Sequence, residues 1–205
     1  LTFLCVGQPT HAANYYVRPD GGTCDQCNGM TDAAYQEGAG NTDCAWSHPF
    51  WALEPDEPPT WKIQGGDTLM VYPGSYRMGF GAPNTDWCDA GYPWDCTLPP
   101  LPSGPDADHP TRVLGIGWDQ GCPAAPELWG TERAYFILNL NGTSHAQIQC
   151  LELTDHESCV ESHADEQVQC RRDSYPFGDW ADTGIYAADS SDILLKNLNM
   201  HGFAA

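Results

Sequence analysis

The feature that most constrains the fold is an apolar pattern that occurs twice near the end of the chain. NGTSHAQIQCLELTDH (141–156) and ADSSDILLKNLNMHGF (188–203) share apolar positions at i, i+2, i+5 and i+7. A period of two that slips by one residue is typical of a strand, a bend and a second strand on another face. Coils of that kind stack so that each buries its apolar row against the next, as in a parallel β-helix. The aligned apolar pairs are Ile148 with Leu195, Leu151 with Leu198, and Leu153 with Met200.

The offset between the two copies is 47 residues, which exceeds one coil of about 20–25 residues. One coil plus an insertion explains the offset, and the obvious insertion runs from Cys159 to about Asp182. Upstream of the copies, Leu138 aligns with Ile185, so the similarity extends beyond the quoted segments. The alternative is a chance similarity between two unrelated β segments.

The rest of the chain also has a β pattern, because Gly, Pro, Asn and Asp interrupt it every few residues and helical periodicity is almost absent. Short alternating apolar runs predict strands at 15–17, 68–72, 112–116 and 135–140. The segment 79–111 is rich in proline and too long for a hairpin turn, so we expect an ordered excursion from the strands.

The charge of the chain excludes several partners. It has 28 Asp and Glu against 8 Lys and Arg, a net charge of −20. Such a surface repels nucleic acids and anionic membranes. It also repels an anionic polysaccharide unless a bound cation such as calcium reverses the local sign. We therefore expect no nucleic-acid partner, and no apolar stretch approaches the length of a membrane span.

The first residues and the cysteines indicate export. Residues 1–13, LTFLCVGQPTHAA, resemble the end of a secretory signal peptide, although a buried N-terminal strand is the alternative. The nine cysteines after this segment favour disulfides in an oxidising compartment. Cys88–Cys96 and Cys159–Cys170 are the local pairs that spacing favours, and disulfide bonding is also the better account of Cys24 and Cys27. The odd number predicts a chain cut short at its C-terminus.

Three stretches near the start of the chain are similar to one known family. They are NYYVRPDGGT (14–23), HPFWAL (48–53) and GGDTLMVYPGSYR (65–77). Together with the later repeats they resemble the N-terminal part of a secreted bacterial right-handed parallel β-helix protein of the pectate-lyase-like superfamily. The resemblance implies that 14–205 form the N-terminal cap and first rungs, the coils of the β-helix, of one domain that is truncated at its C-terminus. It also implies an extracellular polysaccharide as partner. The fold of this family hosts several different activities, so the activity must be inferred from the residues of a site.

The predicted insertion concentrates metal-ligand residue types. The spacing H-x2-C-x3-H-x6-C could hold zinc, but exported cysteines tend to oxidise, so a Cys159–Cys170 disulfide is the favoured interpretation. Calcium is the second possibility, because the insertion is rich in the hard oxygen ligands that calcium needs. The residues for these alternatives are His156, Cys159, His163 and Cys170 for zinc, and Glu161, Asp165, Glu166 and Asp173 for calcium.

Two pairs of residues are candidates for catalysis. In the family that the chain resembles, pectate lyases use calcium and an Arg or Lys base, which Arg171 and Arg172 could supply; a solvated charge cluster is the alternative. A glycosidase needs two carboxyl groups, which Asp189 and Asp192 could supply between two predicted strands. The alternative for these aspartates is a turn role that satisfies backbone groups.

Five tryptophans are expected in loops or beside Pro and Gly: Trp87, Trp94, Trp118, Trp129 and Trp180. Aromatic faces on loops can stack on sugar rings, and Trp118 and Trp180 are the candidates for substrate stacking. The alternative is that they pin long loops to the barrel. For His156 and His201, at the ends of the two copies, we expect a shared turn role.

These observations predict a secreted, polysaccharide-active β-helix protein, either a calcium-assisted lyase or a hydrolase. The competing class is a non-catalytic carbohydrate-binding or cell-surface scaffold, in which the acids and tryptophans serve stability and adhesion.

Overall fold

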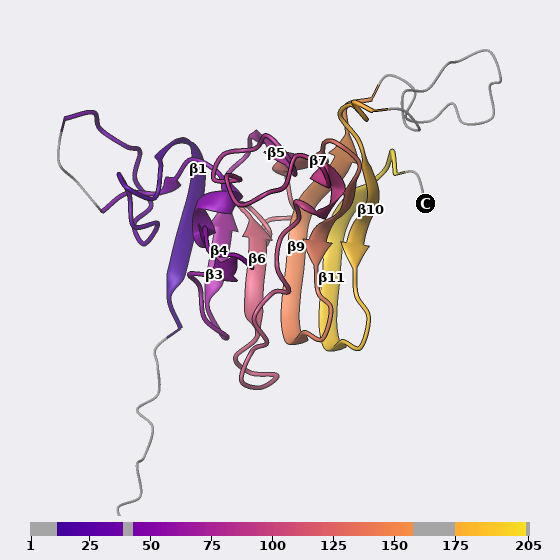
Figure 1. The fold of residues 1–205 in the computed structure, drawn as a ribbon. Helices are drawn as coiled ribbons and strands as arrows, with labels where there is room; N and C mark the ends of the chain where they lie inside the picture. The colour runs from indigo at the N-terminus through magenta and orange to yellow at the C-terminus, as the bar shows by residue number, and fades with distance from the viewer. Residues whose placement is uncertain (1–11, 39–42, 158–174, 204–205) are drawn as a thin grey trace, which may run out of the picture.

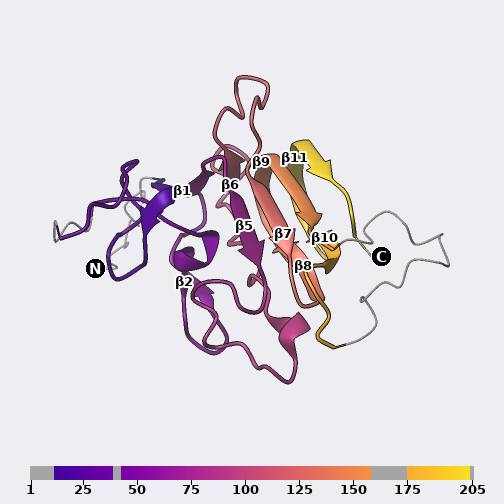
Figure 2. The ribbon, with the colours of Figure 1, turned by 90° about the horizontal axis from the view of Figure 1, so that it is seen from above.

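The computed structural model describes residues 12–38, 43–157 and 175–203, and these are almost entirely β-structure (Figure 1). A large parallel sheet curls as a half-barrel, with two smaller two-stranded sheets beside it (Figure 2). The only helices within the described ranges are two 3-10 turns, η1 (Pro49–Ala52) and η2 (Pro93–Asp95). The strands are β1 (Asn14–Gly22), β2 (Leu53–Glu54), β3 (Thr60–Trp61), β4 (Thr68–Val71), β5 (Ser75–Met78), β6 (Thr111–Gly115), β7 (Glu127–Gly130), β8 (Ala134–Asn139), β9 (Ser144–Asp155), β10 (Ala181–Tyr186) and β11 (Ser191–Met200).

The parallel strands form three ladders. The first ladder consists of β1, β4, β6 and the first halves of β9 and β11, paired in that order. The second ladder consists of β5, β7 and the second halves of β9 and β11. The third ladder is the pair β8 and β10. Within each ladder, the strands follow one another in chain order, so the chain returns to the same ladder after each excursion.

The long strand β9 belongs to two ladders because it bends in the middle. It pairs with β6 before Cys150 and with β7 after it, and Cys150 has a φ of 59°. In β11, Asn197 stands at the corresponding position and has a φ of 54°. His145 and Asp192 adopt the same left-handed conformation at the starts of the two strands. A single left-handed residue turns each strand without ending it, which is the bend that the slipped period of two predicts.

The repeat in the sequence is confirmed as a strand pairing. β11 lies parallel to β9 in the register that the alignment gives, and β10 pairs with β8 so that Ile185 is opposite Leu138. The predicted partners that face each other are Ile148 with Leu195, Leu151 with Leu198, and Leu153 with Met200. Each of the predicted strands 15–17, 68–72, 112–116 and 135–140 overlaps an observed strand, and the last three extend one residue beyond its end. The all-β class with parallel strands is thereby confirmed.

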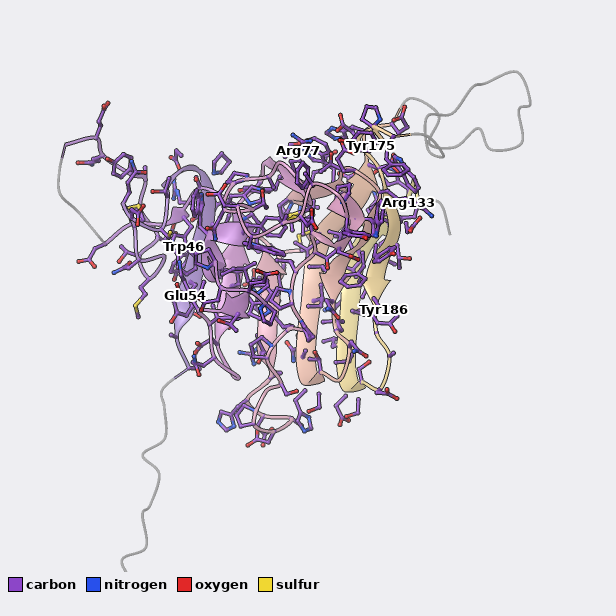
Figure 3. The ribbon with its side chains drawn as sticks, viewed as in Figure 1. Trp46, Glu54, Arg77, Arg133, Tyr175 and Tyr186 are labelled. Carbon is purple, nitrogen blue, oxygen red and sulfur yellow. A yellow bond between two sulfur atoms is a disulfide. The ribbon has the colours of Figure 1, made fainter. Side chains whose placement is uncertain are left out.

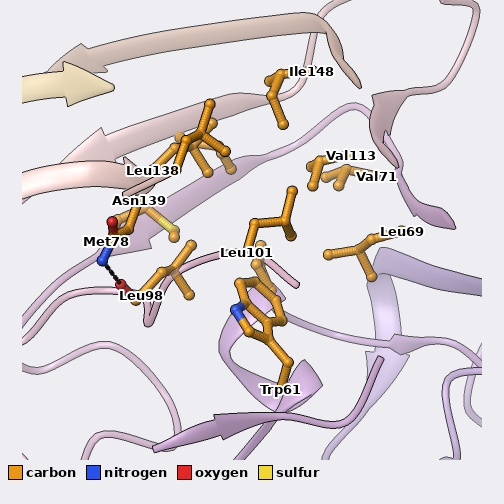
Figure 4. Close-up of a pocket in the computed structure, with 13 residues that line it drawn as sticks. Trp61, Leu69, Val71, Met78, Leu98, Leu101, Val113, Leu138, Asn139 and Ile148 are labelled. Atoms are coloured by element: carbon orange, nitrogen blue, oxygen red, sulfur yellow. Dashed lines mark hydrogen bonds between the residues drawn. The ribbon is translucent and has the colours of Figure 1, made fainter. Parts of the chain in front are cut away.

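The core lies inside the curl of the three ladders (Figure 4). Leu69 and Val113 enter it from the first ladder, Leu128 from the second and Leu138 from the third. The void among the apolar side chains is only about 20 Å³, too small for a ligand, so this space is packed interior. Asn139 borders it and donates a hydrogen bond from Nδ2 to the carbonyl oxygen of Leu98, 3.3 Å away.

The excursion at 79–111 is ordered and returns to the third ladder. The backbone N–H of Leu101 donates to the carbonyl of Asn139 in β8, and Thr143 Oγ1 donates to the carbonyl of Leu101. The Cys88–Cys96 disulfide that spacing favours closes a small loop within the excursion. The end of the excursion therefore lies alongside β8 and is hydrogen-bonded to it and to the turn that follows it.

Two further disulfides connect distant parts of the chain, Cys27–Cys44 and Cys122–Cys150. Cys24 is the free thiol of the described residues, which corrects the expectation that both cysteines of the Cys24-x2-Cys27 spacing are disulfide-bonded. Three disulfides indicate an oxidising, extracellular-type environment. In the ranges that the structure describes, no helix has the length and apolar character to cross a bilayer.

The segment 48–53, which forms η1 and the start of β2, contains a buried histidine. His48 is 5% exposed; its Nδ1 accepts a hydrogen bond from the N–H of Phe50, so its Nε2 carries the proton that is donated to the carbonyl of Arg77, 2.9 Å away. Burial lowers the pKa of His48 to about 4, although the hydrogen bond to Arg77 acts in the opposite direction. The ring is therefore neutral in the folded protein at neutral pH.

Because the unfolded chain binds this proton more tightly, we expect stability to fall as the pH drops from about 6.5 to 4. His48 accounts for about 3 kcal/mol of the loss at pH 4. Urea unfolding at a series of pH values measures this loss of stability in the unaltered protein and in His48→Gln, in which residue 48 cannot be protonated. An identical loss in both proteins would contradict this role, and His109→Gln, an exposed histidine, is the control.

Candidate functional site

Most of the predicted metal and catalytic residues lie in 158–174, outside the described residues. They are Cys159, Glu161, His163, Asp165, Glu166, Cys170, Arg171, Arg172 and Asp173. Their roles in calcium binding, lyase chemistry or a disulfide stay predictions. Elsewhere in the described chain, the side chains form no group of three or more His, Cys, Asp or Glu that could hold a metal ion.

The predicted carboxyl pair Asp189 and Asp192 lies at the turn into β11. Both side chains are exposed, and both residues are left-handed, with φ of 52° and 54°. Asp192 Oδ2 lies 3.7 Å from His145 Nδ1, the equivalent left-handed residue of β9. Asp tolerates this conformation better than most residues. Asp189 therefore lies in the turn between β10 and β11 and Asp192 at the start of β11, while their catalytic role stays a prediction.

The tryptophans behave differently from one another. Trp180 is only 2% exposed, so the prediction that it stacks on a substrate is wrong: its faces are covered by protein. Trp129 lies in β7, directly before Gly130, so of the two expected settings, a loop or a place beside Pro or Gly, it has the second. Trp118 is half-buried in the turn after β6 and borders an open groove on the outer face of the first ladder.

The outer face of the second ladder brings together charged, polar and aromatic side chains that lie far apart in the sequence. Its strand register places Glu127 of β7 directly beside Glu152 of β9, and Glu152 beside Asn199 of β11. In the next row, Arg77 of β5 is beside Trp129, and Trp129 is beside Thr154. The alternating residues Tyr76, Leu128 and Leu153 point the other way, into the core.

Glu127 is held by His156, which follows the end of β9. His156 Nε2 lies 2.8 Å from Glu127 Oε1, and its ring is stacked on Trp129 with centroids 4.1 Å apart. Glu127 is 25% exposed and His156 39%, so the pair is within reach of solvent and ligands. Stacking and hydrogen bonding together fix the imidazole against the carboxylate.

Glu152 is held in the same way by residues in and directly after β11. Its Oε1 accepts hydrogen bonds from Asn199 Nδ2 at 3.1 Å and His201 Nε2 at 2.9 Å. The other ring nitrogen of His201 lies 3.2 Å from Thr154 Oγ1. The two histidines that were expected to share a turn role thus share a different one: each bonds to a glutamate of the neighbouring strand.

A cation borders this cluster, which we name the Glu127–Glu152 site after its carboxylates. Arg77 lies at the upper end of the sheet (Figure 3), with its guanidinium carbon 5.9 Å from the centre of the Trp129 ring. Its Nη2 donates to Thr131 Oγ1 at 3.0 Å, and Thr131 Oγ1 donates to Asp179. The site therefore combines two carboxylates, two imidazoles, an indole and a guanidinium on one sheet face.

The arrangement can support acid–base chemistry. The backbones of neighbouring strands are about 4.8 Å apart, so the two in-register glutamates stand close together on one face. Each carboxylate has one oxygen anchored by histidine, and its Oε2 makes no hydrogen bond to any residue in the described ranges. A pair of adjacent carboxyl groups with free oxygens can exchange a proton with a bound substrate and stabilise positive charge on it.

Sequence reasoning missed both glutamates. ELWG and LELTD each carry the alternation that puts one acid on an outer face, but nothing in the sequence states that these two strands are neighbours. The signal exists only in the pairing of β7 with β9.

The chain was also compared with known proteins. No family model, no curated protein and no solved structure matches it.

Proposed function

We propose that this protein is a secreted right-handed parallel β-helix of the pectate-lyase-like kind and that it hydrolyses an extracellular glycan at the Glu127–Glu152 site. The observation that carries the activity is the in-register pair of outward glutamates, each held by a histidine. Three parallel ladders in chain order, bent at Cys150 and Asn197, support the β-helix interpretation. Parallel crossovers are nearly always right-handed.

In this proposal the two glutamates have different roles. Glu152, whose carboxylate is oriented by two hydrogen bonds, attacks the anomeric carbon and forms a glycosyl ester as the glycosidic C–O bond breaks. Glu127 gives its proton to the leaving oxygen, and then takes a proton from the water that cleaves the ester. The short spacing between neighbouring strands suits this double displacement, which retains the anomeric configuration.

The surrounding residues position these groups. His156 and His201 orient the carboxylates through the anchored oxygens, and Trp129 provides an apolar surface beside them against which a sugar ring can pack. Arg77 adds a positive charge near the leaving group or a neighbouring sugar substituent. The lyase version of the proposal depends on residues between 161 and 173, outside the described chain, so the hydrolase has the stronger support.

The test is digestion of a panel of neutral and acidic polysaccharides by the purified protein, with and without a calcium chelator. A hydrolase produces new reducing ends, unaffected by the chelator, and no unsaturated sugars. Calcium-dependent products that absorb in the ultraviolet would show a lyase instead. Binding of a glycan without cleavage would overturn both enzymes and favour the non-catalytic scaffold.

A further inference from the structure

A groove of about 310 Å³ crosses the outer face of the first ladder, on a different sheet face from the Glu127–Glu152 site. Its volume is within the range of small-molecule sites. Leu114, which is 2% exposed, lines the groove from the face opposite to its neighbour Val113, which belongs to the core cluster, so the groove lies on the outer side of the sheet. The residues that line it are Asn14, Thr68, Met70, Arg112, Leu114, Trp118 and Gln147.

The charge of this face is opposite to that of the whole protein. The register aligns two outer rows across the ladder, and neither contains an acidic residue, although the chain has 28. Two cations, Arg112 and Lys196, stand in these rows. The first row is Asn14, Thr68, Arg112, Gln147 and Leu194, and the second is Tyr16, Met70, Leu114, Gln149 and Lys196.

Arg112 is held in position without an acid. Its Nε donates to Gln147 Oε1 at 3.3 Å, and the same oxygen accepts from Gln149 Nε2 at 3.3 Å. The terminal nitrogens of Arg112 have no hydrogen-bond partner among the residues that the structure describes. By contrast, Arg18 is paired with Asp20 and Asp32 at 2.8 Å. A half-buried guanidinium with free parallel donors is suited to a bidentate anion.

The other walls of the groove suit a sugar. Trp118 supplies an aromatic ring, and Asn14 and Gln147 supply amide groups, whereas Thr68 is only 5% exposed. A nucleic acid carries its charge along the whole strand and would meet the repulsion of the net −20 charge. A saccharide whose negative groups are spaced apart needs a positive charge only where one of those groups binds, and Arg112 supplies it.

We propose that this groove binds an anionic saccharide, with a carboxylate or sulfate on Arg112 and a sugar ring against Trp118. The inference shares with the proposed function only the premise that the partner is a glycan. It gives the protein a binding site on the first ladder, distinct from the site of cleavage on the second.

Calorimetric titration tests the groove with three oligosaccharides of equal length: a uronic-acid, a sulfated and a neutral one. We expect an anionic probe to bind and the neutral one to bind at least tenfold more weakly. Arg112→Gln should weaken anionic binding about tenfold or more. Arg112→Lys should recover part of the loss, because it keeps the charge but not the parallel donors. The two anionic probes tell carboxylate from sulfate recognition.

Arg133→Gln is the matched control, since it removes the same charge from the β8–β10 side of the molecule (Figure 3). It should change the affinity less than twofold, and melting curves confirm that each variant is folded. The proposal is overturned if no anionic probe binds, if the neutral probe binds equally well, or if Arg112→Gln binds like the unaltered protein. Arg112-dependent binding without cleavage of any glycan would overturn the proposed hydrolase and leave the groove standing.

Discussion

Glu127→Gln and Glu152→Gln should each lower the rate of glycan hydrolysis by about 10²–10⁴-fold. Glutamine keeps the size of the side chain and can still bond to histidine, but it neither carries an acidic proton nor attacks the anomeric carbon. Initial rates of reducing-end release, measured at saturating polysaccharide, give the effect on the chemical step. Because both side chains lie on the outer face of the second ladder, we expect the melting temperatures to change little.

The matched control is Glu54→Gln, which makes the same chemical change at an exposed position of β2 (Figure 3). It should keep the full rate. His156→Gln and His201→Gln should produce smaller losses and change the pH profile, because each histidine acts through its glutamate. A Glu127 or Glu152 variant that keeps more than half of the rate would remove that residue from the mechanism.

Gly115→Ala should destabilise the protein by about 3 kcal/mol or more. Gly115 ends β6 at the point where β9 bends, and a Cβ built on it would lie 1.9 Å from the carbonyl oxygen of Cys150. That oxygen belongs to the backbone of a left-handed residue, which the Cys122–Cys150 disulfide also holds. Neither strand can move away without breaking the ladder.

Urea unfolding of Gly115→Ala and Gly91→Ala measures this effect. Gly91 is exposed in the 79–111 excursion, where a Cβ would come no closer than 3.2 Å to the carboxylate of Asp89, so its change should stay within about 0.5 kcal/mol. Equal stability of the two variants would show that the contact between β6 and the bend of β9 is loose.

The register between β9 and β11 was predictable because the same apolar pattern occurs in both strands. The apolar spacing of β9 recurs in β11, and buried apolar side chains on a period of two fix the register of a strand to the residue. The bend was predictable for the same reason, since the slip in the period marks where the strand changes ladder. The left-handed conformation of Cys150, which is unusual for cysteine, was not predicted. No local sequence pattern indicates its disulfide bond to Cys122 either.

The candidate site was not predictable, because its residues come together only through the pairing of strands that are far apart in the sequence. Glu127 and Glu152 are outward residues of two strands whose adjacency appears only when β7 and β9 pair. Trp180 failed as a stacking residue for a related reason. Its place beside Pro and Gly indicated a loop, but packing against the chain around it leaves only 2% of it exposed. Local composition indicates which residues can act, and the tertiary pairing decides which of them meet.

The most direct test of the central claim is glycan digestion in water enriched in oxygen-18, followed by mass spectrometry of the products. Hydrolysis at the Glu127–Glu152 site predicts one oxygen-18 at each new reducing end, with the anomeric configuration retained, and about 10²–10⁴-fold less labelled product from Glu152→Gln in the same time. Unsaturated products without the label, or labelled product formed equally by Glu152→Gln, would contradict it.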